Sequence, residues 1–178
     1  MKQLVQYRRV TEELFFVFRE TRDIVRDIGA AYGGDREKES IIAGLCVDLI
    51  ERYGYRLANI QVKELLPFVA EKKLSYTEID IVVTNKTENP ALLVEVLPHE
   101  EYEFRLHLAM QKLFSVAHAI GRDSPLLSLM CYTRWHEGEL RKESISVVDT
   151  RRFPTYELWQ SSGFACETEI PRRKESGM

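Results

Sequence analysis

The sequence contains few cysteines and no long hydrophobic run. Cys46, Cys131 and Cys166 are far apart in the 178 residues and form no C-x-x-C pair, so the spacing typical of a zinc site or a redox centre is missing. The longest nearly apolar stretch, residues 91–97, is far shorter than the roughly 20 residues that span a bilayer. Charged residues interrupt the apolar positions near the N-terminus, unlike the core of a secretory leader. We therefore expect a cytoplasmic protein with reduced thiols and no membrane contact.

The sequence also lacks the loops that bind nucleotide phosphates. It contains neither a Walker loop nor a G-x-G-x-x-G turn, which argues against a nucleotide-driven motor and a dinucleotide-binding domain. Its four histidines form no H-x-x-x-H pair, and no G-x-S-x-G step supports a serine nucleophile. The net charge of −3 is far from the balance of a nucleic-acid coat, although a local basic face can coexist with it.

The composition is that of one globular domain with an extension at each end. Hydrophobic residues make up 44% of the chain and charged residues 30%, values close to those of ordinary folded domains. We expect a helical extension over residues 1–34 that packs on the core or docks to it. An α/β domain should follow over residues 35–165, and a flexible basic tail over residues 166–178.

Hydrophobic periodicity predicts four helices. The first covers residues 3–31, where the apolar positions at helical spacing are Val10, Leu14, Phe18, Val25 and Ile28. A second stripe of that helix contains Arg19, Arg22 and Arg26, and it is either a phosphate-binding stripe or a solvated face paired with neighbouring acids. The other three helices are expected over residues 35–53, 101–120 and 156–160.

Alternating residues and buried apolar runs predict the strands. The expected strands cover residues 60–69, 77–84, 91–97, 126–133 and 144–148, with a further extended segment near Trp135. Pro67 should break the first of them. Because a long helix separates the third strand from the fourth, a parallel crossover is the economical connection. The expected fold is therefore α/β, with a central mixed sheet flanked by helices and a long N-terminal helix added.

Asp80 and Glu95 are acids embedded in otherwise apolar strands, where a carboxylate is costly unless it is used. If Thr84 pairs with Ala91, antiparallel register sets Asp80 directly opposite Glu95, with Cβ atoms about 4.5–5.5 Å apart. Two facing carboxylates repel each other unless a cation lies between them. Glu39, at the N-terminal end of the buried face of the second helix, offers a further carboxylate.

These acids have two readings. In the first, Asp80, Glu95 and Glu39 hold Mg²⁺ or Mn²⁺, because hard cations prefer oxygen ligands and can polarise a phosphate and activate water. In the second, Asp80 hydrogen-bonds a turn or an arginine, and Glu95 pairs with Arg105 or a lysine.

A series of short motifs follows the order of a known nuclease family. The motifs are, along the chain, a helix with Glu39, the Gly54-Tyr55 step, Glu64, a strand with E-I-D-I-V-V at residues 78–83, a strand with L-V-E-V-L at residues 93–97, and a helix with Gln111. The series resembles the PD-(D/E)XK nuclease superfamily, and within it the N-terminal nuclease domain of type I restriction enzyme R (motor) subunits. The likeness covers roughly residues 37–148.

The resemblance implies a restriction-endonuclease-like core and a Mg²⁺-dependent hydrolase that cuts DNA. It assigns metal binding to Asp80, Glu95 and Glu39, and a place at the site to Gln111. Full-length family subunits contain an ATP motor that this sequence lacks, so translocation would need motor or specificity subunits as partners. DNA would meet Arg151 and Arg152, the N-terminal arginine stripe or the basic tail.

The sequence departs from the family at two positions. Leu97 stands where the family has its catalytic lysine, and Ser115 where it has the tyrosine of its Q-x-x-x-Y motif. Leucine cannot replace an ammonium chemically, but a lysine can reach the site from elsewhere in the fold. Lys112, next to Gln111, is the first candidate and Lys63 the second, although either can also be a solvated surface residue.

Three functions agree with these features. The first is a metal-dependent endonuclease or its restriction-related remnant. The second is an inactive nuclease-fold module that binds DNA or a protein partner. The third is an oligomeric assembly subunit, in which copies associate through the apolar face of the N-terminal helix, formed by Leu14, Phe15, Phe18 and Val25.

Overall fold

The structure of this chain, a computed structural model, describes residues 36–70, 73–120 and 127–172. The chain divides into two compact units, one of Met1–Ala58 with Arg172–Met178 and one of Asn59–Pro171. The helix expected over residues 3–31, with its arginine stripe and its apolar face, lies outside the described residues. So do residues 173–178 of the expected basic tail.

The first unit is described through one helix, α4 (Arg36–Glu51). Its buried apolar residues recur at helical spacing and include Ile41, Ile42, Leu45, Cys46 and Leu49. The chain leaves the helix at Gly54, whose φ of +75° lies in the left-handed region that favours glycine. The Tyr55 amide then donates to the Leu49 carbonyl at 2.9 Å. The second predicted helix is thus confirmed, with its end two residues earlier than expected.

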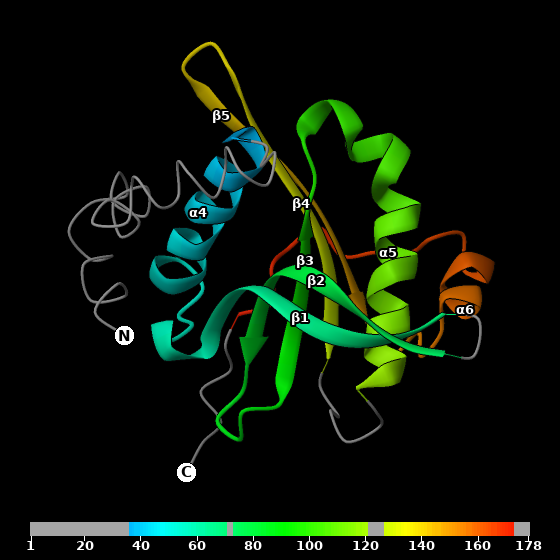
Figure 1. The fold of residues 1–178 in the computed structure, drawn as a ribbon. Helices are drawn as coiled ribbons and strands as arrows, with labels where there is room; N and C mark the ends of the chain where they lie inside the picture. Colours follow the sequence, from blue (N-terminus) through cyan, green and yellow to red (C-terminus); the bar gives the residue numbers. More distant parts are fainter. Residues whose placement is uncertain (1–35, 71–72, 121–126, 173–178) are drawn as a thin grey trace. The chain divides into compact units, whose positions relative to one another are not determined.

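The second unit is built on a mixed sheet of five described strands (Figure 1). The strands, in both chain order and spatial order, are β1 (Ile60–Ala70), β2 (Lys73–Thr84), β3 (Pro90–Val96), β4 (Ser128–Glu137) and β5 (Leu140–Asp149). β3 and β4 are parallel, while the pairs β1–β2, β2–β3 and β4–β5 are antiparallel. The predicted α/β class and the mixed sheet are therefore confirmed.

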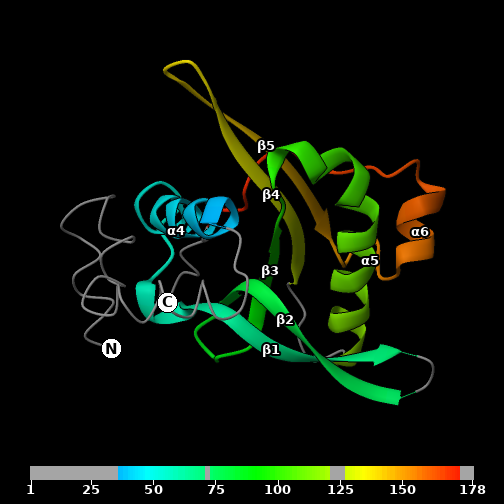
Figure 2. The ribbon, with the colours of Figure 1, turned by 45° about the horizontal axis from the view of Figure 1, so that its top comes forward.

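Two helices of this unit pack together against the sheet, α5 (Tyr102–Ala119) and α6 (Tyr156–Ser161) (Figure 2). α5 follows the short 3-10 turn η4 (His99–Glu101) and connects β3 with the parallel β4, as predicted. The cluster between helices and sheet includes Leu93, Met110, Leu113, Leu129 and Trp159. Among the described residues, no helix is long and apolar enough to cross a membrane.

The position of β1 explains a difference from the sequence prediction. The sequence predicts a break at Pro67, but β1 runs on to Ala70, and Pro67 faces Tyr76 of β2. Proline lacks an amide hydrogen, and β1 tolerates this loss because it is the edge strand of the described sheet. β2 is correspondingly longer than expected and begins at Lys73.

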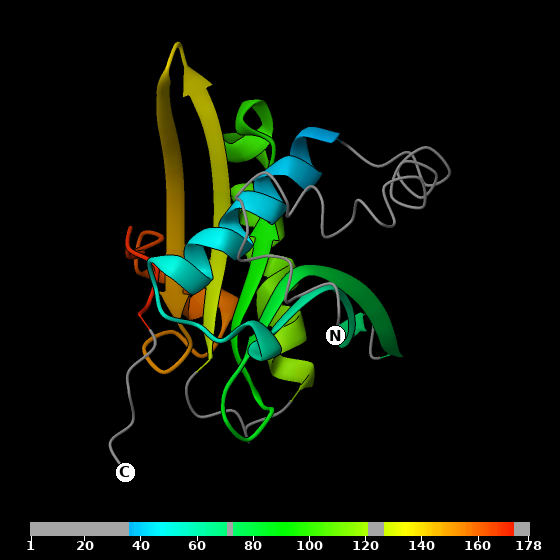
Figure 3. The same ribbon diagram turned by 90° about the vertical axis from the view of Figure 1, so that its left-hand side faces the viewer.

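Two hairpins extend past the end of β3. β3 ends at Val96, which faces Tyr132, so residues 133–137 of β4 pair with β5 as a projecting hairpin (Figure 3). On the other side, β2 pairs with β3 from Ile81 onward. The rest of the β1–β2 hairpin brings Leu66 and Phe68 against the cluster that contains α5. The end of β3 is therefore flanked by this hairpin and by α5.

Candidate functional site

Two buried acids lie where the pairing of β2 with β3 ends. Ile81 pairs with Val94, and the next residue of each strand is an acid, Asp80 in β2 and Glu95 in β3. The sequence predicts the position of the acids from a Thr84–Ala91 pair. An irregularity next to Thr84 shifts its partner to Pro90, but the predicted register holds for residues 81–83. Asp80 is 3% exposed and Glu95 is 6% exposed. Carboxylates buried to this degree require polar partners.

Asp80 holds the end of β3. Its Oδ2 accepts a hydrogen bond from the Val96 backbone amide at 2.8 Å. A carboxylate that accepts from an amide forms a charge-assisted bond, which is stronger than a bond between neutral groups. This partner is a strand amide.

Glu95 binds Lys112 of α5. Lys112 Nζ donates to Glu95 Oε1 at 2.7 Å and to the Glu78 carbonyl oxygen of β2 at 2.6 Å. The side chain of Glu95 is 7% exposed and that of Lys112 is 31% exposed, so the pair is shielded at the carboxylate and accessible at the ammonium. Arg105 instead pairs with Glu101. Lys112 is the residue predicted first to replace the lysine that is absent at position 97. A lysine is also one of the partners that the second reading expects for Glu95.

The packing of α5 explains why Lys112 reaches the acid. Met110 and Leu113, on either side of Lys112 in the sequence, are fully buried, so an apolar stripe anchors this part of the helix. Lys112 lies at the border of that stripe. Its aliphatic stem can lie along apolar surface while the ammonium meets a polar partner.

A cavity of about 350 Å³ lies beside the ion pair. The polar residues of its lining are Glu95, Arg105, Gln111, Lys112 and Ser115, and the apolar ones are Phe68, Leu97, Leu108 and Ala109. Of the predicted site residues, Glu95, Gln111 and Lys112 therefore line one space. Leu97 and Ser115, which stand at the positions of the family's lysine and tyrosine, line it too.

Sequence reasoning misses a buried polar network next to the acids. The Tyr102 hydroxyl bonds to Ser146 Oγ at 2.9 Å and to the Cys131 carbonyl oxygen at 3.3 Å, and Cys131 is the β4 partner of Glu95. Burial raises the pKa of Tyr102. Burial, followed by the charges of Glu95 and Asp80, raises the pKa of the Cys131 thiol, so this cysteine is no nucleophile near neutral pH. Nothing in the spacing of Tyr102 and Ser146 along the sequence links them.

Two further candidates, and the histidine that follows β3, occupy other positions. Glu39 is half-buried in the first turn of α4 and belongs to the first unit, so its place at the metal stays a prediction. Lys63 has an exposed side chain and a φ of +56°, and it occupies the β1 position opposite Asp80. His99 stacks on Trp135, with ring centroids 3.8 Å apart.

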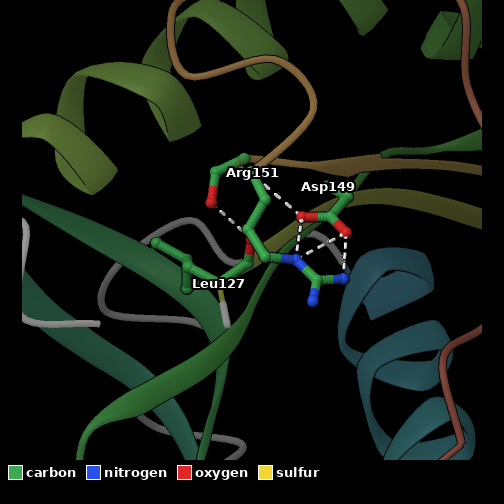
Figure 4. Close-up of polar contacts among 4 residues, drawn as sticks. Leu127, Asp149 and Arg151 are labelled. Carbon is green, nitrogen blue, oxygen red and sulfur yellow. Dashed lines mark hydrogen bonds and ion pairs between the residues drawn. The ribbon is translucent and has the colours of Figure 1, made fainter. Parts of the chain in front are cut away.

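Arg151, a cation considered for DNA, is engaged by Asp149 in the turn after β5 (Figure 4). Arg151 Nε lies 3.0 Å from each carboxylate oxygen of Asp149, and its backbone amide donates to Oδ1 at 2.8 Å. The side-chain hydrogen bonds from Arg151 are the main cause of a lowered pKa at Asp149. In the same turn, the Thr150 hydroxyl donates to the Leu127 carbonyl at 2.7 Å. Arg151 thus has a structural role in this turn.

The donors at the acid pair suit a cation that keeps much of its water. Within residues 36–70, 73–120 and 127–172, no group of three or more His, Cys, Asp or Glu side chains could hold a metal. Mg²⁺ is commonly bound through one or two carboxylates, completed by water and substrate phosphate. A carboxylate offers about four acceptor positions. The pair fits Mg²⁺ or Mn²⁺ better than an ion that needs a full protein cage.

No protein-family model matches the chain, and no curated protein gives a significant match.

Proposed function

We propose that the second unit is a metal-dependent hydrolase that cuts DNA phosphodiesters, with Asp80 and Glu95 as metal ligands and Lys112 as the cation that meets the phosphate. The order of the elements supports this proposal. β2 contains Asp80, β3 contains Glu95, and α5 follows before the parallel strand β4. The resemblance to the nuclease domain of type I restriction R subunits rests on the same order.

The bond between Lys112 Nζ and Glu95 Oε1 carries the proposal. In the family, the lysine after the acid helps to activate the attacking water and offsets charge on the phosphate. This chemistry depends on where the ammonium lies in space, and Lys112 supplies one at the carboxylate although Leu97 occupies the family position. Its side chain is 31% exposed and lines the cavity, so a bound phosphate can reach it.

Each residue has a distinct expected task. A bound Mg²⁺ or Mn²⁺ would polarise the phosphate and make water a better nucleophile. Asp80 and Glu95 would hold the ion, and the Val96 amide keeps Asp80 oriented. Lys112 would bind a phosphate oxygen, and Gln111 would position the substrate from the same cavity.

Leu97 favours a second candidate, a nuclease-fold module that binds DNA or a protein partner without cutting. Leu97 is 2% exposed and belongs to the apolar cluster under α5, so this position has become part of the core. In that case, the Lys112–Glu95 pair would serve stability alone. Motor or specificity subunits are the expected partners under either candidate, and self-association is a further prediction.

Metal-dependent cleavage tests the proposal. Plasmid and single-stranded DNA are incubated with the wild-type chain and Mg²⁺ or Mn²⁺, next to Asp80→Asn and Glu95→Gln, which remove the charge and keep the size. We expect the wild type to cut and each variant to lose on the order of 100-fold or more in rate, as for other groups that stabilise transition-state charge.

The matched control is Glu103→Gln, which removes an exposed carboxylate from α5 and should leave cleavage unchanged. A folded wild-type chain that cuts none of these substrates would contradict the hydrolase. Retention of the same DNA in a gel-shift experiment would then support the binding module.

A further inference from the structure

The lining of the cavity includes apolar residues that a phosphate and a metal ion do not need. Phe68 of β1, Leu97 after β3, and Leu108 and Ala109 of α5 form this apolar lining, in the same cavity as Glu95 and Lys112. Phosphates and hydrated cations gain nothing from contact with hydrocarbon, because such contact removes water without replacing its hydrogen bonds. A ligand that fills the whole cavity must therefore combine an anionic group with an apolar one.

Some residues of this apolar lining are packed into the core, and one is exposed. Leu97 is 2% exposed, and Phe68 packs against the core cluster, so both are held in place. Leu108 is 64% exposed, although it lines the cavity. A leucine this exposed next to a charged pair offers apolar area that a bound ligand would cover.

We infer that this cavity seats a nucleobase that has left the base stack, so that the proposed hydrolase takes single-stranded or unpaired DNA. The inference rests on the proposed function and names its substrate class. A nucleobase has two apolar faces and a polar edge, and its sugar joins it to the phosphate. In a duplex those faces are covered by neighbouring bases, so a protein can use them only on an unstacked base.

The residues of the cavity match the parts of such a nucleotide. Unstacked bases bind against aromatic and apolar side chains, while cations follow the backbone. Phe68 and Leu108 offer the first kind of contact, and Lys112 and Arg105 the second. Gln111 can hydrogen-bond a base edge through its amide.

The departure at Leu97 also fits this assignment. With a lysine at this position, a charged and hydrated group would replace apolar lining that the face of a base can cover. With leucine there, this part of the lining is apolar, and Lys112 supplies the ammonium from α5. Leu97 and the ammonium supplied by Lys112 then belong to one change, from a charged cavity to one with separate phosphate and base regions.

Two DNA strands with identical phosphates test the base site. One is a short thymidine strand, and the other has the same length with abasic sugars throughout. Binding is followed by fluorescence anisotropy for the wild type and Leu108→Ala, with Phe104→Ala as the control, since Phe104 is an 87% exposed residue of the same helix outside the cavity lining.

We expect the wild type to bind the thymidine strand about tenfold more tightly than the abasic strand. Leu108→Ala should reduce that preference about fivefold by removing apolar contact area, and Phe104→Ala should retain it. A blunt duplex of matching sequence should bind more weakly than the single strand.

Equal wild-type binding to the two strands, or binding to neither, would overturn the base site. So would a Leu108→Ala variant that weakens both strands by the same factor. Cleavage is scored separately on the same strands. Base-dependent binding without cleavage contradicts the hydrolase and keeps the base site, whereas equal cleavage of both strands supports the hydrolase and overturns the base site.

Discussion

Lys112 Nζ bonds Glu95 Oε1 at 2.7 Å from a helix that begins only after the strand with this acid has ended. The same ammonium also bonds the Glu78 carbonyl oxygen, so one side chain ties α5 to both β2 and β3. In the family that the sequence resembles, the corresponding lysine lies two residues after the acid, at the position of Leu97. The ammonium of this chain therefore approaches the carboxylate from the helix.

Removal of this ammonium should affect cleavage and metal binding in opposite directions. Lys112→Ala is expected to lower cleavage on the order of 100-fold and to tighten Mn²⁺ binding, because the lysine and the metal compete for Glu95. The unfolding free energy should fall by about 1–3 kcal/mol, since a buried carboxylate loses its partner while the lysine itself is partly solvated. Calorimetric Mn²⁺ titration and urea unfolding measure the two effects.

Lys86→Ala is the matched control for Lys112→Ala, because Lys86 is exposed in the turn between β2 and β3. It should change none of these quantities. Weaker Mn²⁺ binding by Lys112→Ala would show that the ammonium supports the metal site and does not compete with it.

Moving the ammonium back to the strand tests whether its place in space is what matters. Lys112→Leu alone should abolish cleavage. The double variant Leu97→Lys/Lys112→Leu restores the family arrangement and is expected to recover at least about tenfold of the lost rate. Circular dichroism verifies that each variant is folded. A folded double variant that is no more active than Lys112→Leu would refute the equivalence of the two positions.

Thr133 offers a prediction about stability. It is fully buried in β4, and Thr133 Oγ1 has no hydrogen-bond partner among the described residues. A buried polar group without a partner costs about 1–3 kcal/mol, and valine has nearly the same shape. Thr133→Val should therefore raise the unfolding free energy by about 1 kcal/mol in urea titrations.

The same substitution at Thr150 is the control with the opposite sign. Thr150 Oγ1 donates to the Leu127 carbonyl at 2.7 Å, so Thr150→Val removes a real hydrogen bond and should lower stability by about 1 kcal/mol. If both variants shift stability in the same direction, hydrogen bonding is not the cause.

Asp149 should make stability depend on acid pH. Its pKa is lowered in the folded chain from an ordinary value of 3.8, chiefly by hydrogen bonds from Arg151. A carboxylate with a lowered folded pKa stabilises the fold above its unfolded pKa, and this contribution is lost as the pH falls through the folded value. Asp149→Asn should thus be less stable than the wild type near pH 7, with a gap that closes as the pH falls through the lowered folded pKa of Asp149.

Thermal unfolding at a series of pH values measures this gap. Glu139→Gln, a change at an exposed residue of the turn between β4 and β5, should show no comparable pH-dependent gap. A constant difference between Asp149→Asn and the wild type at every pH would assign the effect to packing and not to charge.

The sequence predicts the elements of the second unit better than their lengths. Apolar runs and helical spacing correctly predict β3, β4 and α5, because each buries a continuous face and its pattern is strong. The behaviour of Pro67 could not be predicted, since tolerance of proline depends on whether a strand lies at the sheet edge. Strand order is a property of the whole sheet and is not written in the local pattern.

The residues of the site also differ in how well the sequence predicts them. Asp80 and Glu95 can be found from the sequence because acids in apolar strands are rare, and the hairpin register places both at the end of the paired segment. The Lys112 contact could only be proposed, since it depends on the rotation of α5 over the sheet. The bond between Tyr102 and Ser146, by contrast, joins residues from distant elements that show no shared pattern.

Metal binding by Asp80 and Glu95 is the most direct test of the proposed hydrolase, because it requires no knowledge of the DNA substrate. Mn²⁺ is titrated into the wild-type chain and into the double variant Asp80→Asn/Glu95→Gln, with binding followed by calorimetry. We expect one Mn²⁺ site in the wild type that disappears in the double variant, while both proteins remain folded. Equal binding by the two proteins, or no binding by the wild type, would contradict the assignment of Asp80 and Glu95 as metal ligands.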